Sequence, residues 1–173
     1  MSIHERLGYN FPHEHTIIQL ANINSSCYIN SVLQSLFNVP RIQQYLEDVE
    51  RILNEKNAKD TFSGTLFCLF VKIYIDSQRA PQNEVYYEPN YFLDKLFSIS
   101  KTLVRGAMGD SFEFFWILIN QFDKEIRQIN QSLCGPSEIL IHPFSDHFKF
   151  GISSRRNPAF PAYPYPLAEE FVT

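Results

Sequence analysis

The sequence predicts an α+β domain that is mostly helical, with a short β segment near residues 138–152. Apolar residues recur with a helical period in 40–53 and again in 110–129, and the stretch 61–75 is apolar on nearly all sides. Residues 138–152 instead show some alternation of apolar and polar positions, which is typical of strands. With 173 residues, 45% hydrophobic content, sixteen Phe and nine Tyr, the chain is long and apolar enough to form a core.

The first half of the chain predicts three helices. The first begins in the polar cluster 22–26, because Ser and Asn are preferred N-caps, and ends near Asn38, ahead of Pro40. Pro40 fits the first turn of a second helix, which runs to about residue 53. A charged connection at 54–60 leads to the apolar helix 61–75, which we expect to be buried on most sides.

The second half predicts a loop over 76–88, a shorter helix over 91–97 and a long amphipathic helix over 110–129. One or two strands are expected within 138–152. We expect an irregular arm over 1–16, one folded domain over 17–152 and a Pro-rich extended tail over 153–173.

Charge and cysteine content exclude several classes of protein. The formal charge is -4 with the signs interspersed, so we expect neither nucleic-acid nor membrane partners. Three widely separated cysteines form no disulfide framework and no CxxC pair for zinc, and nothing implies a metal or a cofactor. The N-terminus lacks the apolar run of a signal peptide. These features favour an intracellular protein of the cytoplasm, the nucleus or both.

Cys27 follows a polar loop and opens a predicted helix. The positive end of the helix dipole favours a thiolate there, and the free N–H groups of the first turn can stabilise an oxyanion. The alternative is that Cys27 is a small buried residue of a helix start.

The string from Gln19 to Gln34 resembles the cysteine box of ubiquitin-specific proteases, Gly-Leu-x-Asn-x-Gly-Asn-Thr-Cys-Tyr-Met/Leu-Asn-Ser-x-Leu-Gln. The matching residues are Leu20, Asn22, Cys27, Tyr28, Asn30, Ser31, Leu33 and Gln34, with close substitutions at Ser26 and Ile29. Asn24 replaces a glycine, and Asn tolerates positive φ well. The resemblance implies a papain-like cysteine protease fold, here incomplete, and makes residues 17–152 a partial catalytic domain. It also implies that Cys27 attacks the carbonyl at the end of the ubiquitin tail while Asn22 donates its amide to the oxyanion. The alternative for Asn22 is a loop residue bonded to its own backbone.

A second string, 108–118, resembles the family's motif Gln-Gln-Asp-Ala-x-Glu-Phe-Leu. Asp110, Glu113 and Phe114 match, whereas Met108 and Gly109 stand where the family has glutamines. The resemblance, which covers roughly residues 20–122, implies that Asp110 and Glu113 bind the basic tail of ubiquitin. The alternative is that they only cap a helix.

A cysteine protease also needs a base, and the family's Gly-His-Tyr segment is absent. His147, next to Asp146, is the one histidine with strand-like surroundings. Three hypotheses remain. The chain is a truncated thiol-dependent deubiquitinase with weak or no activity alone, an inactive ubiquitin-binding or scaffold module, or an unrelated helical interaction domain. Ubiquitin or ubiquitinated proteins are the partners that the first two imply.

Overall fold

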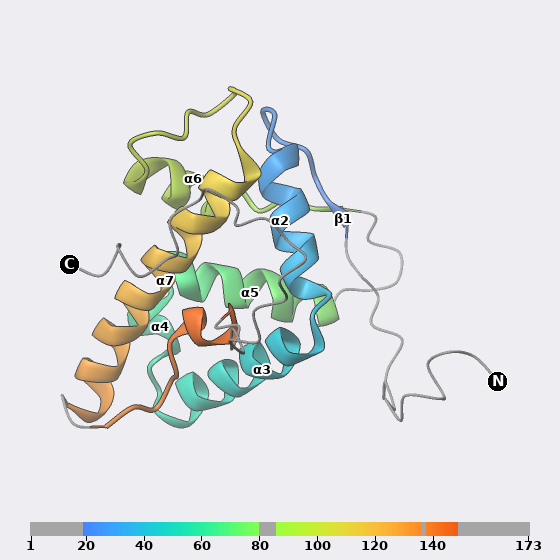
Figure 1. The fold of residues 1–173 in the computed structure, drawn as a ribbon. Coiled ribbons are helices and arrows are strands. Elements are labelled where there is room, and N and C mark those ends of the chain that lie inside the picture. The colour runs from blue at the N-terminus through green and yellow to red at the C-terminus, as the bar shows by residue number, and fades with distance from the viewer. Residues whose placement is uncertain (1–18, 80–85, 136–137, 149–173) are drawn as a thin grey trace, which may run out of the picture.

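A computed structural model describes residues 19–79, 86–135 and 138–148 as a helical assembly with one small parallel sheet (Figure 1). In chain order the elements are β1 (Gln19–Leu20), α2 (Cys27–Phe37), α3 (Pro40–Glu55), α4 (Lys59–Phe62), α5 (Leu66–Arg79), β2 (Tyr86–Tyr87), α6 (Asn90–Ile99), α7 (Ser111–Cys134) and the 3-10 helix η1 (Phe144–Phe148). The two strands pair Gln19 with Tyr86 and Leu20 with Tyr87.

Helix α5 is the centre of the core and packs against α3, α6 and α7, while α2 lies against α3 and α7. The apolar residues of α5 are buried on most sides of the helix, as the sequence predicts. An aromatic cluster joins α5, α7 and η1 through the fully buried rings of Phe67, Phe70, Phe122 and Phe144. The Phe70 and Phe122 rings lie 4.9 Å apart, and Phe122 and Phe144 meet edge to face at 5.2 Å.

The predicted helices are confirmed with shifted ends. Pro40 is the first residue of α3, and Asp110 caps α7, which continues five residues past the predicted end at 129. The apolar helix begins at Leu66 and not near Thr61, because a turn at 63–65 separates it from the short α4. Glu125 of α7 explains the later start: its carboxylate accepts the N–H groups of Leu66 and Phe67, at 3.2 and 2.7 Å.

The predicted β segment is wrong for residues 138–148, which form an irregular stretch followed by η1. Ile141 finds its hydrogen bonds on a side chain and not on a strand. The Asn130 amide accepts the Ile141 N–H at 3.0 Å and donates to its carbonyl at 2.8 Å. Phe144 then turns into the core at the start of η1. Residues 149–152, the rest of this prediction, lie outside the described residues.

The predicted arm over 1–16 and tail over 153–173 also lie outside the described residues, so those boundaries stay predictions, as does the extent of the domain over 17–152. Across the described ranges, no helix combines the length and apolar character needed to cross a membrane.

Candidate active site

Cys27 is the first residue of α2, and its side chain is exposed. The preceding residue, Ser26, occupies the N-cap position but makes no side-chain hydrogen bond to the helix. The N–H groups of the first turn therefore receive no hydrogen bond from the Ser26 side chain, and Cys27 itself belongs to that turn. This is the arrangement that the sequence predicts, and it suits both a thiolate and an oxyanion.

The loop before Cys27 is tightly closed. The Ser26 N–H donates to the Ile23 carbonyl at 3.2 Å, and the Ile23 N–H donates to Ser26 Oγ at 2.9 Å. Asn24 and Ser25 both adopt left-handed backbone conformations, with φ of 49° and 63°. The expectation that Asn24 takes the positive φ of a glycine is confirmed. Asn22 is exposed at the mouth of this loop, and its Oδ1 lies 3.5 Å from Ser26 Oγ.

The two acidic residues at the start of α7 have different surroundings. Asp110 is the N-cap, and its carboxylate accepts the N–H groups of Phe112 and Glu113 at 2.6 and 3.2 Å. Its capping role is thus confirmed by geometry. Glu113 lies exposed in the first turn, and within the described ranges no cation forms an ion pair with it.

The starts of α2 and α7 meet at one open pocket of about 290 Å³, and Figure 1 shows these two helix ends side by side. Its lining comes from both motifs: Cys27, Tyr28, Ser31, Met108, Gly109 and Ser111. A second open pocket of about 240 Å³ shares Ser31 and Ser111 with the first and continues along α2. Residues some eighty positions apart in sequence therefore form one groove that begins at the cysteine.

The ring of Tyr28 packs closely against Gly109. A Cβ on Gly109 would lie 2.6 Å from Tyr28 Cζ, which is closer than any normal contact. The Tyr28 ring, which is buried, also meets Phe114 edge to face at 6.2 Å. In this fold position 109 thus has no room for a side chain beside the Tyr28 ring, a contact that a motif comparison by itself cannot show. Met108, the other replacement, is exposed and lines the pocket.

The electrostatics of Tyr28 connect the two motifs. Burial raises the pKa of its phenol most, and Glu113 and then Cys27 raise it further, because a phenolate there would face negative charge. Glu113 therefore lies within electrostatic reach of the cysteine end of α2, although neither it nor Asn22 lines the pocket.

Histidine is absent from the pocket lining among the residues that the structure describes. His147 instead packs against Tyr45 of α3, with ring centroids 4.5 Å apart. Both of its ring nitrogens are buried, and within the described ranges neither has a hydrogen-bond partner. Burial lowers the pKa of His147, with Arg41 acting in the same direction, while Asp146 opposes them. The structure does not bring the His147–Asp146 pair to Cys27.

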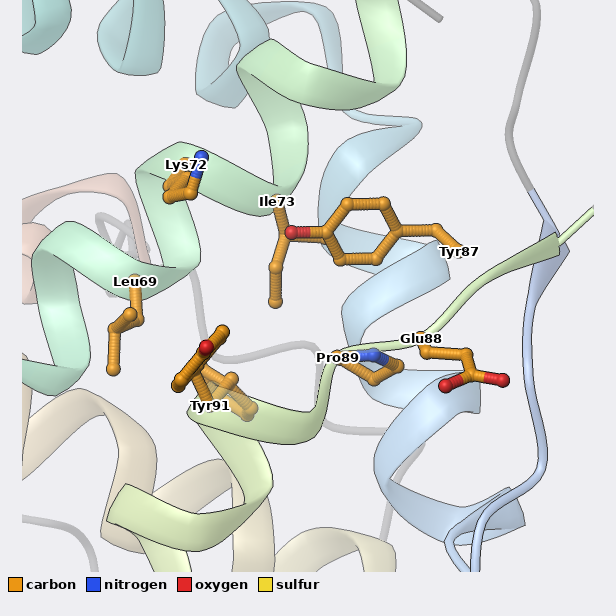
Figure 2. A pocket seen from close by; sticks show the side chains of 8 residues that line it. Leu69, Lys72, Ile73, Tyr87, Glu88, Pro89 and Tyr91 are labelled. Atoms are coloured by element: carbon orange, nitrogen blue, oxygen red, sulfur yellow. The ribbon is translucent and has the colours of Figure 1, made fainter. Parts of the chain in front are cut away.

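A smaller cavity of about 20 Å³ lies between α5, β2 and α6 (Figure 2). Tyr87 points its ring toward Ile73, and Tyr91 lies between Leu69 and Pro89. The cavity holds about one water molecule and is lined by no cysteine or histidine. Over the described ranges, His, Cys, Asp and Glu side chains form no group of three or more that could hold a metal ion.

Comparisons with known proteins agree with the two motifs. The family model for ubiquitin carboxyl-terminal hydrolase matches residues 18–158. Proteins named ubiquitin carboxyl-terminal hydrolase 36 are 29% identical over 105 residues in Drosophila pseudoobscura pseudoobscura and 28% identical over 105 residues in Drosophila melanogaster. The one from Drosophila grimshawi is 30% identical over 107 residues.

Each of these alignments covers 61% of this chain but only 8–10% of the relative, so the chain spans about a tenth of the length of the curated relatives it matches. No solved structure gives a significant match. The family model nevertheless covers well over half of the chain, with both motifs inside it. The chain belongs to the ubiquitin carboxyl-terminal hydrolase family.

Proposed function

We propose that this chain is part of a thiol-dependent deubiquitinase in which Cys27 attacks the carbonyl carbon of the C-terminal glycine of ubiquitin. The observation that supports this most is the pocket at which the exposed Cys27 and the start of α7 meet. A nucleophile at a helix start, with uncapped N–H groups beside it, has the parts needed for acyl transfer to sulfur.

In the proposed reaction the Cys27 thiolate forms a bond to the carbonyl carbon, and the π electron pair moves to the oxygen. First-turn N–H groups of α2 and the Asn22 amide stabilise the resulting oxyanion. Collapse expels the amine of the conjugated protein, which takes up a proton, and water then hydrolyses the thioester. The proton transfers need a base, and we propose that it comes from outside the described residues, completing a papain-like site.

Glu113 is the proposed contact for the basic tail of ubiquitin, since it is exposed, acidic and close to the cysteine end of α2. The carboxylate of Asp110 is engaged in the helix cap, so Asp110 acts mainly by fixing the start of α7.

A second candidate is a ubiquitin-binding module without catalysis. The absence of a histidine from the described lining of the pocket favours it, because a cysteine without a base turns over slowly. Both candidates require ubiquitin to bind at the α2–α7 groove.

Calorimetric titration of ubiquitin into the wild type and Glu113→Ala tests that shared requirement. We expect Glu113→Ala to weaken binding by about 2 kcal/mol, roughly thirtyfold in Kd, because a charge pair in a desolvated groove is lost. Thermal melts of both proteins should nearly coincide. Glu138→Ala, an exposed glutamate beyond the far end of α7, is the matched control and should bind as the wild type does. Equal affinities with a lower Tm for Glu113→Ala would reduce Glu113 to a helix-start residue.

A further inference from the structure

The segment that carries Asn22 is held from both sides. On one side the Ala21 N–H donates to the Tyr87 carbonyl of β2 at 2.9 Å. On the other side Asn30, in the first turns of α2, donates its side-chain amide to the carbonyls of Leu20 and Ala21, at 3.2 and 3.0 Å. These carbonyls belong to the two residues before Asn22, so α2 and the strand pair together fix the backbone position from which the Asn22 side chain extends.

Asn30 makes these bonds at a cost. Its Oδ1 is buried and finds no hydrogen-bond partner among the residues that the structure describes. An unpaired buried acceptor is unfavourable, so a side chain selected for stability alone would avoid it. The amide geometry therefore serves the two donated hydrogen bonds.

Ser26 forms hydrogen bonds at the other end of the loop that runs from Asn22 to Cys27. Its side chain is 1% exposed, and its Oγ already accepts the Ile23 N–H. The one hydroxyl proton is then available for Asn22 Oδ1 at 3.5 Å, the long end of hydrogen-bond distance. With Oδ1 facing Ser26, the two N–H groups of the Asn22 amide face away from the loop.

We propose that Asn30 and Ser26 are positioning residues that hold Asn22 as the oxyanion donor for Cys27. The inference rests on the proposed function. An oxyanion donor accelerates acyl transfer only when it is aimed before the charge develops. The loop includes two left-handed residues, Asn24 and Ser25, and such a backbone keeps its shape only when its surroundings impose it.

Ubiquitin with a C-terminal aldehyde tests this without requiring turnover. The Cys27 thiol adds to the aldehyde: an S–C bond forms, the C=O π pair moves to oxygen, and the thiol proton ends on that oxygen. No group leaves, so the equilibrium affinity reports how well the site holds the tetrahedral oxygen. Ordinary ubiquitin, with its carboxylate, reports non-covalent binding alone.

Ser26→Ala and Asn30→Leu should each raise the Kd for the aldehyde by roughly tenfold or more and leave the Kd for ordinary ubiquitin within about twofold. Ser26→Thr, which keeps the hydroxyl, should restore the affinity for the aldehyde. In an Asn22→Ala background, neither change should weaken aldehyde binding further. The two variants alter opposite ends of the loop, so the test holds if one of them does not fold.

Ser98→Ala and Asn120→Leu are the matched controls, because each removes a side-chain hydrogen bond to a carbonyl three or four residues earlier in a helix, and neither residue lines the groove or bonds to the loop. Wild-type affinity for the aldehyde in both Ser26→Ala and Asn30→Leu, with a loss in Asn22→Ala, would overturn the positioning role and leave the proposed function intact. Equal losses for the aldehyde and for ordinary ubiquitin would also overturn it. A wild type that binds the aldehyde no more tightly than ordinary ubiquitin would overturn the proposed function itself.

Discussion

Glu125 links α7 to the central helix α5, and its removal should be among the most damaging single changes to the fold. The residue is 4% exposed, and its carboxylate accepts the N–H groups of Leu66 and Phe67 together with the Gln121 side-chain amide at 2.7 Å. It thus supplies the N-terminal cap of α5 from a residue almost sixty positions away. The charge also complements the positive end of the α5 dipole.

Glu125→Ala leaves two buried N–H groups without acceptors, each costing about 1–3 kcal/mol, so we expect a loss of about 3 kcal/mol in the free energy of unfolding. For a chain of this size that corresponds to about 6–12 °C in Tm. Glu125→Gln keeps the shape and one acceptor, and its loss should be about half as large. Urea denaturation measures both.

Glu55→Ala is the control, because Glu55 is an exposed glutamate whose 3.4 Å pair with Arg51 should contribute little. If the free energy of unfolding of Glu125→Ala lies within about 0.5 kcal/mol of the wild-type value, the helix cap that we infer does not exist in solution. The later start of α5 would then need another cause.

Two further predictions concern packing and pH. Gly109→Ala should lower the free energy of unfolding by about 1–2 kcal/mol in urea titrations, because its Cβ would lie 2.6 Å from the Tyr28 ring. Gly64→Ala is the control and should lower it much less, because open space surrounds Gly64. Equal losses of stability in the two variants would contradict the close contact with Tyr28. The lowered pKa of His147 means that its neutral form stabilises the fold above about pH 6.5 and that this contribution is lost as pH falls through the folded-state pKa. His147→Phe should therefore reduce the loss of stability between pH 7 and pH 5, and an unchanged loss would show that His147 is not buried as described.

The helices were predictable because each has a periodic apolar face and a clear start. Pro40 and Asp110 begin α3 and α7 as their residue types indicate. The strand prediction near 138–152 failed for the described residues 138–148, where the apolar residues pack from an irregular stretch and from η1. Asn130 gives Ile141 the hydrogen bonds that a neighbouring strand would otherwise supply, and no pattern in sequence shows that. The two-residue strands were too short to leave any period.

Within the candidate site, the position of Cys27 at the start of α2 was predictable from the polar cluster 22–26 that precedes the helix. The contact between Tyr28 and Gly109 was not, because it joins the two motifs through space and depends on how α7 packs on α2. In the motif Asn30 was visible as a match and Ser26 as a close substitution, but their roles follow only from the hydrogen bonds they make. Met108 and Gly109 count as departures in the comparison of motifs, whereas in the folded chain they line the pocket.

The reaction of ubiquitin bearing a C-terminal vinyl sulfone with the folded chain tests the central claim most directly. Burial raises the pKa of the Cys68 thiol to about 11, so that thiol is protonated at neutral pH and shielded from the reagent. The account predicts one ubiquitin per chain, attached at Cys27 when the adduct is mapped by mass spectrometry, and no adduct in Cys27→Ala. Attachment at Cys134 in place of Cys27, or no adduct on a chain whose Cys27 reacts readily with a small vinyl sulfone, would contradict the assignment of this pocket to the ubiquitin tail.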